Sequence, residues 1–290
     1  MRSTMIRPLR HFLSLAFVPF MLMSCAVPEL PTKDYTGPVA SEKEVKEAEA
    51  SAKLLDGVNK NQLSAEQREE MMRSVYAKVS QSGSEVCATV SVRNFRYCRK
   101  FKLIVSDNPS LNSYPFDTSD INIHKDLLSY TDNEDEMALL IAHNMAHHLA
   151  NHINEDYERT RTDFNTVKYK ADMWLWIYGK PLSKSENPTG SGFEESGAHS
   201  YSIYQEYEAD YLAAYLVNSA GYSIDKAIVF YEKMYFLNPK TGKEVKTEAG
   251  LFDTHPFSLV RIARLQNAAK EIAEKRNEKQ PVVPNEDSSN

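Results

Sequence analysis

The sequence has no excess of positive charge. Its 290 residues include 34 lysines and arginines against 40 aspartates and glutamates, which gives a formal net charge of −6. Proteins that bind nucleic acids neutralise phosphates with a cationic surface, so this balance argues against nucleic acid as a partner. The chain also has no internal repeat and no low-complexity tract, and its length suits one domain with a proper hydrophobic core.

Long hydrophobic runs are scarce. Residues 11–23 form one apolar stretch that follows three arginines, and it is too short to span a membrane comfortably. This layout is typical of a secretory signal peptide. The stretch ends in Leu-Met-Ser-Cys, which resembles the lipobox of bacterial lipoproteins. We therefore predict a signal peptide over residues 1–24 and a lipid on Cys25. The alternative is an ordinary signal peptide followed by a chance cysteine.

Two polar segments flank the predicted domain, which covers residues 41–273. Residues 25–40 contain three prolines and indicate a tether between lipid and domain. Residues 274–290 are polar without periodicity and indicate a disordered tail. Ala26 follows the cysteine, and by resemblance to other lipoproteins it favours the outer membrane, with the domain facing the periplasm.

Cysteine is rare, and only Cys87 and Cys98 remain besides Cys25. In an oxidising periplasm, two cysteines at this separation are expected to form a disulfide bond across a hairpin. The alternative is a pair of buried free thiols.

The first half of the domain mixes helical and extended patterns. Apolar residues recur at helical spacing over residues 41–79, which predicts two or three helices. Alternating apolar residues over 86–92 and 101–105 predict a β-hairpin, and residues 120–124 predict a third short strand. Together these three strands are expected to form a small sheet.

From residue 132 the pattern is helical. The first helix is predicted to run to about residue 157, and acidic residues at its start favour the helix dipole. Two more helices are predicted over residues 202–220 and 223–236. Residues 173–178 are apolar and belong either to a core helix or to a substrate cleft, and the loop 186–197 could act as a lid. The predicted fold class is α+β, mainly helical.

The candidate chemistry begins with two histidines. His143 and His147 are four residues apart on a predicted helix, so both imidazoles lie on one face within reach of one metal ion. A later helix carries Glu206 and Asp210, also four residues apart. Catalytic zinc sites commonly use two histidines and one carboxylate, and a metal-bound histidine usually donates its other N–H to a carboxylate. We therefore expect one carboxylate to bind one zinc ion and the other to orient a histidine.

Several motifs occur together in a fixed order. They are the segment Asn112-Ser113-Tyr114, the run from Glu136 to His147, the Glu-x-x-Ala-Asp segment from Glu206 to Asp210, Ala220-Gly221-Tyr222, Thr254-His255-Pro256, and Arg261-Ile262. This series resembles the Peptidase_M48 family of zinc metallopeptidases, which includes CAAX prenyl endopeptidases, HtpX-like proteases and periplasmic outer-membrane quality-control proteases. The resemblance covers about residues 41–273 and implies a zincin-like metallopeptidase domain with a small β-sheet and an active-site helix.

The resemblance also implies roles for single residues. His143, His147 and Glu206 match the three metal ligands, and Asp210 matches the carboxylate that orients a ligand. A separate set matches the edge strand that pairs with an extended polypeptide substrate: Asn112, Ser113 and Tyr114.

Two further residues match positions near the cleft, His255 and Arg261. His255 either approaches and gates the metal or is only a turn residue fixed before Pro256. By helix geometry His148 and His152 are expected off the metal-binding face, and Glu208 is expected to point away from it.

Asn144 departs from the family pattern, which has His-Glu-x-x-His where this chain has His-Asn-x-x-His. The glutamate normally takes a proton from the attacking water and passes it to the leaving amine. A carboxamide can orient water but cannot act as this base. Losing a general acid–base group costs about two to four orders of magnitude in rate, while metal binding is almost untouched.

Three hypotheses remain at this point. The first is a zinc-binding pseudopeptidase that binds unfolded or misassembled outer-membrane proteins, with the outer-membrane assembly machinery as a possible partner. The second is an active zinc endopeptidase in outer-membrane protein quality control. The third is a structural lipoprotein without metal, and the retained ligand set argues against it.

Overall fold

The computed structural model describes residues 35–55, 61–90, 101–106, 120–152, 201, 203–237 and 258–287. The elements in these ranges are α1 (Glu42–Lys53), α2 (Ala65–Val90), β1 (Lys102–Ser106), β2 (Asp120–His124), α3 (Lys125–Leu128), α4 (Glu134–Leu149), α6 (Ile203–Ser219), α7 (Ile224–Ala227), α8 (Val229–Leu237) and α9 (Leu259–Asn277). The predicted α+β, mainly helical fold with a small sheet is confirmed. Across the described ranges, every helix is too short or too polar to traverse a bilayer.

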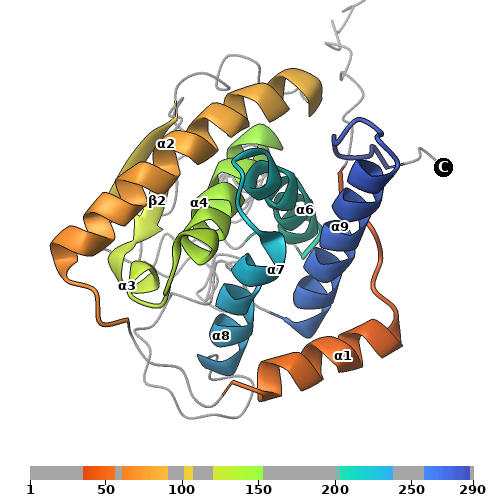
Figure 1. The fold of residues 1–290 in the computed structure, drawn as a ribbon, viewed down its shortest axis with the longest axis horizontal. Coiled ribbons are helices and arrows are strands. Elements are labelled where there is room, and N and C mark those ends of the chain that lie inside the picture. The colour runs from red at the N-terminus through yellow and green to blue at the C-terminus, as the bar shows by residue number, and fades with distance from the viewer. Residues whose placement is uncertain are drawn as a thin grey trace, which may run out of the picture. The chain divides into compact units, whose positions relative to one another are not determined.

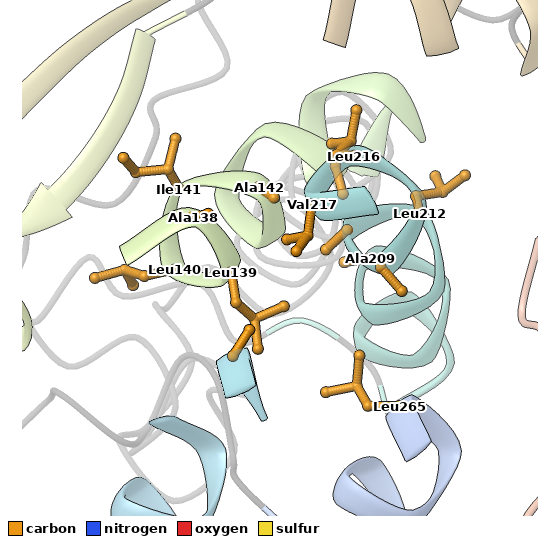
Figure 2. Close-up of a cluster of buried hydrophobic side chains, with 14 of the residues drawn as sticks. Ala138, Leu139, Leu140, Ile141, Ala142, Ala209, Leu212, Leu216, Val217 and Leu265 are labelled. Atoms are coloured by element: carbon orange, nitrogen blue, oxygen red, sulfur yellow. The ribbon is translucent and has the colours of Figure 1, made fainter. Parts of the chain in front are cut away.

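Helices α4 and α6 lie side by side at the centre of the domain, with α2 packed on one side and α9 on the other (Figure 1). Helix α4 is buried along nearly its whole length, because α2, β2, α6, α7 and α8 all contact it. Figure 2 shows the apolar side chains between the two central helices, where Ala138, Ala142 and Ala209 are fully buried. Small residues at these points let the two backbones approach closely, which brings their polar side chains together as well.

The start of α4 agrees with the prediction, but its end does not. Asn133 caps the helix by accepting a hydrogen bond from the backbone N–H of Glu136 at 3.0 Å. The helix was expected to continue to about residue 157, yet α4 ends at Leu149, and Asn151 adopts a left-handed backbone with φ of 65°. Asparagine tolerates this conformation better than most residues, so the chain turns sharply there.

The sheet differs from the predicted hairpin. Residues 86–90 belong to α2, whose buried face carries Val75, Val79 and Val86 at helical spacing. The alternating apolar residues over 86–90 also fit a strand, but packing against the core favours the helix. In the part of the chain that the structure describes, the strands are β1 and β2, which pair in parallel with Leu103 opposite Ile121 and Val105 opposite Ile123.

Both segments predicted to be unstructured at the domain's edges are partly ordered. Tyr35, in the predicted tether, is buried, and Arg264 donates to the carbonyl of Thr36 at 2.6 Å. The predicted disordered tail from residue 274 is corrected, since α9 continues to Asn277. Beyond it, Lys275 donates to the carbonyl of Val283 at 2.6 Å and to Asn285 Oδ1 at 2.8 Å. Residues on both sides of the predicted bounds 41 and 273 therefore pack against the domain.

Candidate metal centre

Two buried histidines on α4 face one another. His143 and His147 are one helical turn apart, and their Nε2 atoms are 3.2 Å apart. Glu206, in the first turn of α6, completes the group, with its carboxylate oxygens 3.5 Å from His143 Nε2 and 3.6 Å from His147 Nε2. The packing of α4 against α6 therefore brings two imidazole nitrogens and a carboxylate close together.

This group fits a zinc ion. One ligand atom from each of the three residues lies within 4.8 Å of the others. A tetrahedral zinc ion with bonds of about 2.0–2.1 Å holds its ligands roughly 3.3 Å apart, close to the separations found here. Two histidines and a carboxylate are also a common donor set of catalytic zinc sites, which leave a fourth position open.

Asp210 lies one turn beyond Glu206 on α6 and contacts the far side of His143. Its Oδ1 is 3.0 Å from His143 Nδ1, the nitrogen turned away from Glu206. A carboxylate at this position fixes the proton on Nδ1 and leaves Nε2 free to bind a metal. The predicted orienting role of Asp210 agrees with this geometry.

Arg261 is placed differently from the expectation that it lies near the cleft. Its side chain is 0% exposed, and Nη1 lies 2.6 Å from Glu206 Oε2. Its Nε and Nη2 atoms each donate to Asp210 at 2.7 Å, and the Tyr231 hydroxyl donates to the same carboxylate at 2.7 Å. Arg261 is therefore a buried counter-ion that holds the two carboxylates, rather than a group that faces a substrate.

These contacts set the protonation states of the centre. Burial by itself raises the pKa of Asp210, but the charge and hydrogen bonds of Arg261 and His143 outweigh burial and hold that pKa well below its ordinary value. Burial lowers the pKa of Arg261, yet Asp210 and Glu206 raise it far above the ordinary value. Burial also lowers the pKa of His143, which favours the neutral imidazole that binds metal.

His152, expected off the metal-binding face, lies outside the three-residue donor group but contacts His147. Because α4 ends at Leu149 and the chain turns at Asn151, His152 comes back toward the helix, with its Nδ1 2.9 Å from His147 Nδ1. Its Nε2 is 3.0 Å from Glu208 Oε2, although Glu208 was expected to point away. The ring of Tyr201 also stacks on His147 with centroids 3.8 Å apart. The only sequence signal for this arrangement is Asn151, a residue type that often ends helices.

Asn144 occupies the expected position between the two histidines and is partly exposed. Its Nδ2 donates to the carbonyl of Leu140 one turn back at 2.9 Å. The amide group is therefore tied to its own helix. It offers an oxygen for hydrogen bonding but no base.

Three titratable residues that could take the place of the missing base are already paired with other groups. Glu136 accepts hydrogen bonds from Lys233 and from the backbone N–H of Asp132 at the start of α4. Glu208 pairs with His152. His148 has its Nε2 3.0 Å from the carbonyl of Asp120, and burial lowers its pKa to about 4.

Several predicted site residues lie outside the described ranges. They are Asn112, Ser113, Tyr114, His255, Cys25, Cys98, and the segments 173–178 and 186–197. Cys87 is disulfide-bonded, and its partner is also outside these ranges. The pairing of Cys87 with Cys98 therefore stays a prediction.

Two buried histidines and a glutamate on two packed helices form a donor set of the kind that metallopeptidases use. Residues 76–269 match Peptidase family M48, and the chain belongs to this family. The chain is 22% identical over 181 residues to the Beta-barrel assembly-enhancing protease of Yersinia pestis, covering 59% of this chain and 35% of the relative. It is 22% identical over 183 residues to the protein of the same name from Escherichia coli K12, again covering 59% and 35%. It is 26% identical over 177 residues to the Mitochondrial metalloendopeptidase OMA1 of Schizosaccharomyces pombe, covering 61% and 49%. The chain thus spans between a third and half of these relatives' lengths.

Proposed function

We propose that this chain is a zinc-binding M48 lipoprotein of the outer membrane that binds unfolded or outer-membrane proteins and has impaired proteolysis. The ligands are His143, His147 and Glu206, and the lipid is on Cys25. A zinc ion bound there would act as a Lewis acid toward a peptide carbonyl. The names of the bacterial relatives support the choice of outer-membrane proteins and their assembly machinery as clients or partners.

The proposed impairment of proteolysis rests on the residue at position 144. The chain has an asparagine there, and its amide nitrogen donates to Leu140. Glu136, Glu208 and His148 are engaged elsewhere, so none of these three stands in for a general base. Binding of a polypeptide does not require that base, because neither metal coordination nor pairing with an edge strand uses it.

The second candidate function is an active zinc endopeptidase in outer-membrane protein quality control. The metal ligands and Asp210 favour it, because they form the arrangement that orients a catalytic ion. This candidate needs a proton acceptor from outside the described ranges.

Substitution at position 144 separates the two candidates. The native chain is compared with Asn144→Glu and with Asn144→Gln, which has the same length as glutamate but no basic oxygen. Cleavage of casein and of an unfolded porin is measured after zinc content has been confirmed by metal analysis. We expect cleavage near background for the native chain and Asn144→Gln, and a gain of about 10²–10⁴-fold for Asn144→Glu.

The opposite pattern would support the active enzyme. Robust cleavage by the native chain that disappears in His143→Ala refutes the pseudopeptidase. A native chain purified without chelators that contains no zinc refutes the metal centre itself.

A further inference from the structure

The two histidine ligands are supported in different ways. His143 Nδ1 meets the carboxylate of Asp210 directly at 3.0 Å. His147 Nδ1 instead meets the imidazole of His152 at 2.9 Å, and His152 in turn meets Glu208 at 3.0 Å. Glu208 therefore supports His147 indirectly, through the imidazole of His152.

The hydrogen bonds from His147 through His152 to Glu208 have a fixed donor and acceptor at each step once a metal occupies the site. A metal on His147 Nε2 puts the ligand's proton on Nδ1, so His147 donates and the Nδ1 of His152 accepts. His152 then carries a proton on Nε2, which faces Glu208 Oε2 as a donor. Each nitrogen along the path has one role, and no proton is left without an acceptor.

Packing holds His147, His152 and Glu208 in place. His152 is fully buried, and Glu208 is also buried. The other oxygen of Glu208 accepts a hydrogen bond from the backbone N–H of Tyr35 at 3.1 Å. The ring of Tyr201 stacked on His147 restricts rotation of the ligand. Because these contacts fix Glu208, His152 and His147, the position of the Glu208 carboxylate can set the orientation of the His147 ring.

We propose that His152 and Glu208 are positioning residues of the metal centre, which fix the tautomer and ring orientation of His147 and so raise metal affinity. This inference rests on the proposed zinc site. Outer groups that hold a ligand in this way are typically worth 10- to 100-fold in metal affinity.

The test uses zinc binding by the full chain, measured by competition with a chromophoric chelator after the metal has been stripped. His152→Phe keeps a planar ring and removes the acceptor, so we expect zinc affinity to fall by about 10- to 100-fold. His152→Gln offers one acceptor and one donor, as neutral imidazole does, and should retain most of the affinity. The absorption spectrum of bound Co²⁺ should change in the phenylalanine variant and not in the glutamine variant.

The matched control is His148→Phe, because His148 is a buried histidine at the same end of α4 that bonds the Asp120 carbonyl rather than a ligand. It should lose stability without losing zinc affinity. If His152→Phe does not fold, Glu208→Gln replaces it, with an expected loss near the lower end of the same range. A folded His152→Phe or Glu208→Gln with native zinc affinity overturns the positioning role. Absence of zinc binding in the native chain overturns the proposed zinc function instead.

Discussion

Replacing Arg261 by methionine should destabilise the metal-free protein strongly. The guanidinium is 0% exposed and lies between two buried carboxylates, 2.6 Å from Glu206 and 2.7 Å from Asp210. Methionine fills a similar volume without charge. The variant therefore keeps the packing and leaves two buried carboxylates facing each other without a cation.

The size of the effect follows from this geometry. Removing one partner of a buried ion pair costs about 3–5 kcal/mol, because the remaining charge stays desolvated. For a domain of this size, each kcal/mol lowers the melting temperature by about 2–4 °C. The chelator-treated variant should therefore melt roughly 6–20 °C below the native protein. Zinc should recover part of this loss, because the ion supplies positive charge at Glu206.

The assay is thermal unfolding followed by circular dichroism, with and without zinc. The matched control is Arg264→Met, which lies one turn further along α9 and is only half-buried over the Tyr207 ring. It should cost about 1.5–3 kcal/mol, less than Arg261→Met, because it removes the charged hydrogen bond to the Thr36 carbonyl but keeps the cation beside Glu206 and Asp210. A shift in Arg261→Met no larger than in Arg264→Met would refute the view that Arg261 neutralises the two carboxylates.

Two further substitutions test the edges of the domain. Gly37→Ala should lower the free energy of unfolding by at least about 1–3 kcal/mol, because φ is +70° and the new Cβ would lie 2.3 Å from Tyr211 Cδ2. Urea unfolding measures this, and Gly221→Ala is the control, since φ there is +84° but nothing lies within 4 Å. Burial raises the pKa of Glu271, but hydrogen bonds from Tyr215, Tyr211 and Lys275 outweigh burial and lower it. Its stabilisation is therefore present above the ordinary pKa of 4.5 and lost as the pH falls below it. Glu271→Gln should flatten the loss of stability between about pH 5 and pH 3 in urea unfolding, and an unchanged acid dependence would contradict this.

Local spacing was enough to predict which side chains of α4 and α6 come together. His143 with His147, and Glu206 with Asp210, each share a helix face whatever the rest of the fold does. The family resemblance also pointed to Arg261, but its buried contacts depend on how α9 packs against α6, which no local pattern contains.

The features that the sequence did not predict also depend on tertiary packing or on a single turn. The contact of His152 with His147 depends on where α4 ends, and the backbone turn at Asn151 decides that. The alternation over residues 86–90 fits both a strand and one face of a helix, and packing against the core chose the helix. The segment after residue 274 is polar, yet Lys275 and Glu271 bind it through contacts that composition does not reveal.

The hydrogen bonds between the two edges of the domain bear on when the protein can fold. Thr36 donates from its N–H and from its hydroxyl to Asp287, 251 positions later in the sequence. Tyr211, on the helix that carries Glu206, accepts a hydrogen bond from the backbone N–H of Asn285 at 2.9 Å. Contacts between such distant residues form late and slow folding, because most of the chain must be ordered first. The helix that carries Glu206 therefore completes its packing only once the segment that contains Asn285 has joined the fold.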